Sequence, residues 1–264
     1  MKKRLLSLVL ALATCLSLCT TVFADPSVSI EGKKAYLRNV CNIPDSFLDS
    51  VEDETVEKIY EEAAGNSVTV ASYNEVTENM EEPTQAISPM ASIPASDFKM
   101  STLVLKTTDS AGSKTLYYTV YTYYKWFDKD PFCRRRDGIT VNWDNTLLTY
   151  MPGYFSLKSY LKNDVNPKWR EYASDNVPDA SNQGGVGVSF LLSADKGNWL
   201  KGTLSFRLVT DFSGSGRRTT INSQYAHTYD LIIASIGFNA DGPGINFSTT
   251  TKRKLCSSSA MITL

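Results

Sequence analysis

The stretch Leu200-Lys201-Gly202-Thr203-Leu204-Ser205-Phe206-Arg207-Leu208-Val209-Thr210-Asp211-Phe212 alternates between apolar and polar side chains. Its even positions are mainly apolar and its odd positions mainly polar, which is typical of a β-strand that buries one face and exposes the other. Similar strand patterns occur in Met100–Thr107, Thr115–Phe127, Ile139–Trp143, Phe155–Leu161, Val186–Leu192, Thr219–Thr228, Leu231–Phe238 and Gly244–Ser248.

Turn-forming sequences separate these segments, among them Asp109-Ser110-Ala111-Gly112, Pro152-Gly153 and Asp195-Lys196-Gly197-Asn198. Consecutive strands without intervening helices favour an antiparallel architecture. We therefore predict a mainly β protein, with an antiparallel β-sandwich or jelly-roll-like domain over residues 98–264, preceded by a short acidic helical segment.

The segment Thr115–Phe127 is rich in aromatic residues on both faces. Its even face is the more apolar, so we assign it to the core. The odd face then directs Tyr117, Tyr121 and Tyr123 outward, where a row of rings would suit the flat faces of sugars. The alternative is that a second sheet or the N-terminal segment covers these tyrosines, since tyrosine also favours strands for packing reasons.

An amphipathic helical pattern lies near the N-terminus. Ile43-Pro44-Asp45 is a start signal, and Gly65-Asn66 ends the pattern. The apolar positions recur every three or four residues and face a strongly acidic side. The run forms either one bent helix or two short helices, with a break near Glu52-Asp53. Helices this short need a partner to cover the apolar stripe.

Charge is distributed unevenly along the 264 residues. The formal net charge is -1 and the isoelectric point about 5.9, which argues against a uniformly basic nucleic-acid-binding protein. Residues 25–96 hold 14 acidic and 4 basic side chains, whereas residues 97–264 hold 14 acidic and 20 basic ones. We expect the acidic segment to dock on the basic β domain of the same chain.

This charge division suggests a domain organisation. We predict an acidic helical segment over residues 25–74 and a linker rich in Pro, Ser and Glu over residues 75–97, before the β domain. Two interpretations of the acidic segment remain open. It is either a lasting extension of the β domain or a propeptide that masks a basic surface until the linker is cut.

The first 24 residues have the pattern of a secretory signal peptide. Lys2, Lys3 and Arg4 precede an apolar run, and Val22-Phe23-Ala24 provides a cleavage site after Ala24. We therefore expect a secreted, extracellular protein without a transmembrane segment in its mature chain.

Three cysteines remain in the mature chain, at positions 41, 133 and 256. We predict a Cys133–Cys256 disulfide, with three buried thiols as the alternative. Such a bridge would bring together two basic triplets and create a positive patch for anionic polymers or lipid headgroups. The triplets are Arg134, Arg135 and Arg136, and Lys252, Arg253 and Lys254.

Catalytic motifs are absent from the sequence. His227, the single histidine, has no accompanying nucleophile or metal-binding motif, so we interpret it as a structural residue. Asp128 with Asp130 or Asp137 could serve glycoside hydrolysis only if the fold sets a suitable separation. We identify no metal site and no cofactor.

Three sequence runs resemble uncharacterised secreted proteins of Gram-positive bacteria. They are the acidic helical run Ile43–Glu62, the joint Ile93–Lys99, and Asp137–Trp143 within the β domain. This resemblance implies export and a two-part layout of acidic leader and β domain, but it implies no activity and transfers no site residue.

These observations favour a secreted, non-catalytic β-sandwich that acts at the cell envelope or on an extracellular partner. The expected ligand is an anionic cell-wall polymer or a carbohydrate, with no nucleic-acid partner. The alternatives are a secreted polysaccharide hydrolase, which needs converging carboxylates in a groove, and a leader-masked toxin or bacteriocin-like protein, which needs a detachable leader.

Overall fold

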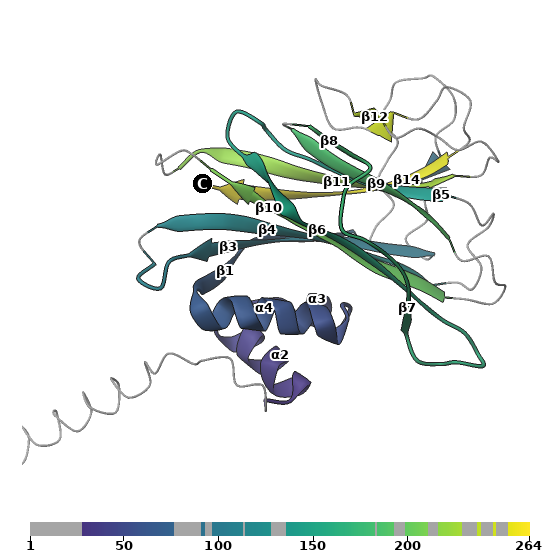
Figure 1. Cartoon of the computed structure of the whole chain (residues 1–264), viewed down its shortest axis with the longest axis horizontal. Coiled ribbons are helices and arrows are strands. Elements are labelled where there is room, and N and C mark those ends of the chain that lie inside the picture. Colours follow the sequence, from purple (N-terminus) through teal and green to yellow (C-terminus); the bar gives the residue numbers. More distant parts are fainter. Residues whose placement is uncertain are drawn as a thin grey trace, which may run out of the picture.

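Two antiparallel sheets form the body of the molecule in the computed structural model (Figure 1). The structure describes residues 28–76, 91–92, 97–112, 114–127, 136–182, 184–192, 199–210, 216–228, 237–238, 245–246 and 253–264. The predicted signal peptide lies outside these ranges. The predicted fold class, a mainly β protein with two packed sheets and short N-terminal helices, is confirmed.

The first sheet, sheet A, contains six of the described strands in the order β1-β3-β4-β10-β6-β7. Their bounds are Ser67–Val76 for β1, Phe98–Thr108 for β3, Thr115–Trp126 for β4, Trp199–Val209 for β10, Thr149–Lys162 for β6 and Arg170–Asp175 for β7. All neighbouring strands in sheet A run antiparallel.

The second sheet, sheet B, has the order β2-β14-β11-β5-β9-β8 among the described strands. The bounds are Ala91–Ser92 for β2, Arg253–Thr263 for β14, Arg218–Thr228 for β11, Arg136–Asn142 for β5, Gly185–Leu191 for β9 and Ala180–Asn182 for β8. Only the short β2 pairs in parallel within this described sheet. A two-stranded ladder joins β12 (Gly237–Phe238) to β13 (Ile245–Asn246).

The main apolar core lies between the two sheets, because the alternating strands direct their apolar faces toward one another. The predicted core face of β4 is confirmed, since Tyr118, Val120, Tyr124 and Trp126 are all buried there. Several polar side chains within this core are paired. Ser223 of β11, for example, lies 2.9 Å from the hydroxyl groups of two threonines, Thr102 and Thr122 of sheet A.

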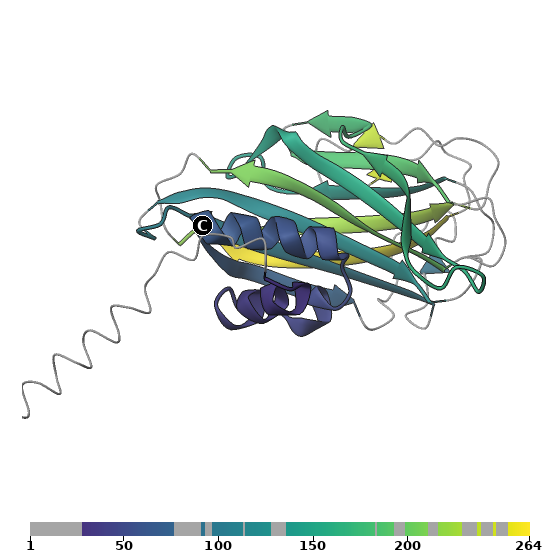
Figure 2. The same ribbon diagram turned by 60° about the horizontal axis from the view of Figure 1, so that its bottom comes forward.

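A second core lies on the opposite, outer face of sheet A, beneath three helices (Figures 1 and 2). The predicted helical run is broken into α3 (Asp45–Leu48) and α4 (Asp53–Gly65), so the two-helix alternative is correct. Phe47 and Leu48 of α3, and Val56 and Ile59 of α4, are completely buried. This burial supplies the partner that short helices need.

A further helix, α2 (Ile30–Asn39), was not predicted from the sequence. Ser29 caps its first turn by accepting a hydrogen bond from the Gly32 amide at 3.2 Å. The helix packs on α4, where the rings of Tyr36 and Tyr60 meet edge to face at 5.3 Å. An ion pair of 2.9 Å between Lys33 and Glu57 joins the same two helices.

Strand β1 is the main departure from the predicted layout. Residues 67–74 were assigned to the helical segment, yet the whole of Ser67–Val76 pairs with β3 as an edge strand of sheet A. The strands β7, β8 and β14 were also missed. The predicted strands Leu231–Phe238 and Gly244–Ser248 lie largely outside the described residues, apart from the short β12 and β13.

Candidate binding site

The tyrosines predicted to form an exposed row lie beneath the helices instead. Tyr121 and Tyr123 are only 4% and 1% exposed, so the exposed platform is wrong for both. The alternative, cover by the N-terminal segment, is what the structure shows, with the Phe47 and Tyr121 rings 6.0 Å apart. Tyr117 is half-buried, and its ring lies 4.1 Å from the Arg207 guanidinium carbon.

Half of the predicted basic patch lies outside the described residues, namely Arg134, Arg135 and Lys252. The backbones of Arg136 in β5 and of Arg253 and Lys254 in β14 are described. Both strands pair with β11, and His227 of β11 is opposite Asp137 on one side and Lys254 on the other. The backbones of Arg136 and Lys254 therefore lie near the same end of sheet B, about 10 Å apart across two strand spacings.

The predicted disulfide is not shown. Cys133 lies outside the described residues, while Cys41 and Cys256 are free thiols. Burial raises the pKa of the Cys41 thiol to about 11 and that of Cys256 to about 12. Both thiols are therefore protonated and weakly nucleophilic near neutral pH.

His227 is buried in the core between the sheets, as expected for a structural histidine. Its Nδ1 atom lies 2.8 Å from a carboxylate oxygen of Asp137, whose other oxygen accepts a hydrogen bond from Tyr225. The Trp126 indole in turn donates to Tyr225 at 3.0 Å. Asp137, one of the carboxylates considered for hydrolysis, is thus held inside the core, while Asp128 and Asp130 lie outside the described residues.

Ion pairs fasten the acidic helical segment to sheet A, as its charge predicted. At one end of α4, Glu52 pairs with Lys201 and Glu54 with Lys158. At the other end, Glu62 pairs with Arg207 at 3.1 Å. The carboxylates at the start of α4 also interact favourably with the helix dipole.

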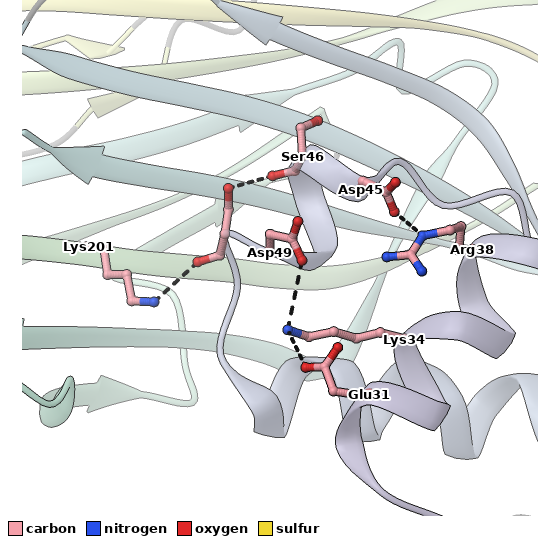
Figure 3. Close-up of polar contacts among 8 residues, drawn as sticks. Glu31, Lys34, Arg38, Asp45, Ser46, Asp49 and Lys201 are labelled. Carbon is pink, nitrogen blue, oxygen red and sulfur yellow. Dashed lines mark hydrogen bonds and ion pairs between the residues drawn. The ribbon is translucent and has the colours of Figure 1, made fainter.

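Figure 3 shows how Lys201 reaches the connection between α3 and α4. Its Nζ atom donates to the Ser50 carbonyl oxygen at 3.2 Å, and the Ser50 hydroxyl donates to the Ser46 carbonyl oxygen at 2.5 Å. Arg38 of α2 pairs with Asp45 of α3 in the same region. Lys201 is buried and is therefore a structural contact for the helical layer.

A row of lysines crosses sheet A next to this connection. Lys125 of β4 is directly opposite Lys99 of β3 on one side and Lys201 of β10 on the other. Lys99 pairs with Glu75 at 3.0 Å and Lys201 pairs with Glu52. Within the described residues, Lys125 has no carboxylate partner, and like charges opposite one another on a sheet are unfavourable.

Burial lowers the pKa of Lys125, and the neighbouring charges of Lys201, Lys162 and Lys99 lower it further. An anion bound beside the Lys125 ammonium group would offset part of the free-energy cost of keeping that group charged, because an opposite charge favours the charged form of a lysine.

Two tryptophans extend the lysine row toward the edge of the sheet. Lys162 of β6 directs its Nζ atom toward both rings, 5.0 Å from the centre of Trp169 and 5.2 Å from that of Trp199. Lys201 also lies over Trp169, at 4.7 Å. Both indoles are half-buried, so part of each remains accessible. We call Lys125, Lys162, Trp169 and Trp199 the lysine–tryptophan surface.

This surface combines positive charge with flat apolar rings. Lysine ammonium groups bind carboxylate, sulfate or phosphate oxygens, while indole rings offer a stacking face for the CH groups of a sugar. Sequence reasoning missed it, because Trp169 and Trp199 belong to different segments and only strand pairing brings them to Lys162. The sequence feature that could have indicated this surface is the presence of Lys125 and Lys201 in segments whose other residues are mainly apolar or aromatic.

Among the described residues, no group of three or more His, Cys, Asp or Glu side chains is arranged to hold a metal ion. The helices in the described ranges are also too short or too polar to cross a bilayer.

Comparisons with solved structures give distant matches. No family model matches the chain, and no curated protein matches its sequence. Among solved structures, the collagen-binding domain of a Staphylococcus aureus adhesin shares 8% identity, with coverage of 53% of this chain and 86% of that one and a TM-score of 0.29. A pore-forming protein also shares 8% identity, with coverage of 74% and 91% and a TM-score of 0.31.

A second structure of the Staphylococcus aureus collagen adhesin shares 8% identity, covers 75% of this chain and 81% of that one, and has a TM-score of 0.28. Likenesses this distant transfer neither ligand nor activity. The fold class therefore rests on the two sheets themselves, and the function on the side chains that they present.

Proposed function

We propose that this protein is a secreted, non-catalytic binding protein that acts at the cell envelope or on an extracellular partner. Its ligand is an anionic carbohydrate polymer, bound at the lysine–tryptophan surface. The signal-peptide pattern of residues 1–24 supports export. The observation that carries the ligand class is the Lys162 ammonium group between the rings of Trp169 and Trp199, beside Lys125.

The chemistry of the surface matches such a polymer in two respects. Its lysines supply charge for acidic groups that repeat along a chain, and its indoles supply apolar faces for the sugar rings between them. A small inorganic anion would use only the charge. An uncharged polysaccharide would use only the rings and would leave the repulsion among the lysines in place.

The test compares binding of polygalacturonate and neutral dextran to the purified chain at low and high salt. We expect dextran to bind weakly and polygalacturonate to bind well at low salt, with a loss at high salt because salt screens exposed charges. The double substitution Lys125→Gln and Lys162→Gln should weaken polygalacturonate binding about tenfold, which corresponds to about 1.4 kcal/mol. Trp169→Ala should weaken it at both salt concentrations.

The matched control is Lys114→Gln, which removes an exposed lysine beside the other end of β4. This variant should bind like the unchanged protein. Equal binding by the double variant and the control would contradict the proposal. Loss of binding only after both basic triplets are changed to glutamine would also contradict it, and would assign the polymer to the end of sheet B.

A further inference from the structure

A pocket of ≈ 530 Å³ lies at the opposite end of α4 from the lysine–tryptophan surface. Its walls come from α4, β4, β6 and β10, together with Asn176 after β7. The volume is within the range of about 300–1,000 Å³ that is common for small-molecule sites. Nothing in the proposed function uses this pocket.

Arg207 of β10 is held in one orientation on the pocket wall. The rings of Tyr117 and Tyr154 lie 4.1 Å and 4.3 Å from its guanidinium carbon. Its Nη2 atom donates to Glu62 at 3.1 Å. Glu62 is itself only 7% exposed in its side chain and also accepts a hydrogen bond from Thr107 at 2.5 Å. Stacking and ion pairing together fix a planar guanidinium group before any ligand arrives.

An irregularity in β6 places Tyr154 over this arginine. Ser205 of β10 is opposite Ser156, but Arg207 is opposite Met151, so four residues of β6 face a single residue of β10. Gly153 within this bulge has a φ of +89°, a conformation that glycine adopts without steric cost. Bulges of this kind redirect a side chain out of the regular strand pattern. Tyr154 is consequently 46% exposed at the pocket.

The charges around the pocket balance. Lys58 and Arg207 face Glu61 and Glu62, and the Glu62–Arg207 pair is already formed. A ligand with a net charge would meet repulsion from one sign or the other. The remaining polar groups are amides and hydroxyls, including those of Asn66, Asn176 and Ser205. These groups are both donors and acceptors, as the hydroxyl groups of a sugar require.

We propose that this pocket binds a neutral saccharide unit that carries an acetamido group. The sugar ring stacks on Tyr154, and the acetamido oxygen accepts a hydrogen bond from the guanidinium N–H groups of Arg207 that Glu62 does not use. This site is separate from the anionic-polymer surface at the other end of α4 and does not depend on it.

The test titrates the full chain with the β-1,4-linked trimer of N-acetylglucosamine and with cellotriose, which lacks the acetamido groups. Calorimetry should show one saturable site for the acetamido trimer and at least tenfold weaker binding of cellotriose. Affinity should be nearly the same at about 0.05 M and about 0.5 M NaCl, because screening acts on charged ligands.

Two variants test the assigned contacts. Tyr154→Ala should weaken binding of the trimer about tenfold through loss of the stacking face. Arg207→Lys keeps a positive charge beside Glu62 but removes the planar donors, and should weaken binding to a similar degree with a melting temperature close to that of the unchanged chain. The control is Phe127→Ala, since Phe127 is a comparably exposed aromatic residue outside the pocket.

Absence of saturable binding, or equal affinity of the Tyr154→Ala variant and the unchanged chain, would overturn the proposal. Binding of the trimer that is lost in the Lys125→Gln and Lys162→Gln variant would also overturn it, because the sugar would then occupy the lysine–tryptophan surface. The first two results leave polygalacturonate binding unaffected, so this proposal can fail while the polymer proposal stands.

Discussion

The two faces of sheet A are both buried, but by different means. The inner face packs against sheet B through a largely apolar and aromatic core. The outer face packs against three helices through an apolar centre with ion pairs at each end of α4. The inner interface therefore holds mainly by the exclusion of water, whereas the outer interface adds charge complementarity that selects one docking position.

This difference shows how one strand can serve two cores. The odd positions of β4 change along the strand from Tyr121 and Tyr123, which are buried by α3 and α4, to Lys125, which is not paired with any described carboxylate. The helical layer thus divides the outer face of sheet A. It covers the centre and leaves a candidate binding surface at each end of α4.

The first prediction concerns proteolytic cleavage of the chain between β1 and the rest of the β domain, which would have the largest effect if the fragments separated. Because β1 pairs with β3 along its length and the helices bury an apolar core, we expect both pieces to stay together after cleavage at a protease site inserted between residues 77 and 90. Size-exclusion chromatography after cleavage should show one peak that contains both fragments. Separate elution would contradict this expectation and would support the interpretation of the acidic segment as a releasable propeptide.

A second prediction compares the stability of the two cores directly. Phe47 of α3 and Phe206 of β10 are both completely buried, one on each face of sheet A. Replacement of either by alanine should reduce the free energy of unfolding by about 3–5 kcal/mol. Chemical denaturation of the two variants should therefore give similar losses in one cooperative transition. A separate early transition in Phe47→Ala alone would show that the helical layer unfolds independently.

The smallest predicted effect is the acid sensitivity of the outer interface. The hydrogen bond from Lys158 lowers the pKa of Glu54 below its usual value of 4.5. Burial by itself would raise the pKa of Glu75, but hydrogen bonds from Tyr73 and Lys99 outweigh burial and lower it. A carboxylate whose pKa is lower in the folded chain than in the unfolded chain stabilises the fold at any pH above its unfolded-state pKa. That stabilisation is lost as the pH falls through the pKa of the folded state.

We therefore expect the melting temperature to be steady near neutral pH and to fall below about pH 4.5, with a contribution of about 0.5–1 kcal/mol from each of these partly exposed pairs. The double variant Glu54→Gln and Glu75→Gln should be less stable at neutral pH and should show a smaller fall in acid. An identical fall in the double variant would assign the acid sensitivity to other carboxylates.

Much of the sandwich could be predicted because strand alternation is a local property. The segments that became β3, β4, β9, β10 and β11 all show it in the sequence. Strands β1 and β14 were missed for a physical reason. Residues 67–76 follow directly on a helix, and β14 is rich in serine, which is a weak strand signal. Their strand conformation depends on ladder hydrogen bonds with β3 and β11.

The candidate sites were much less predictable than the fold. Tyr117 and Tyr121 were singled out as part of a flat exposed row, but both line the pocket beneath α4, and the structure makes Tyr154 the exposed ring. No sequence pattern indicates a role for Trp169, Trp199 or Tyr154. Each contacts its lysine or arginine only because of the strand pairing or the bulge in β6.

The sequence by itself determined the period of the strands, the helical character of the acidic run, the apolar face of β4 and the opposite charges of the two parts of the chain, because each is a property of neighbouring residues or of composition. Only the tertiary structure decided that the acidic segment contributes strand β1, that helices bury the tyrosine face, and that lysines and tryptophans from separate strands meet. Those outcomes depend on contacts between segments that are distant in the sequence. A pattern that predicts burial of one face of a strand does not specify which segment covers the other face.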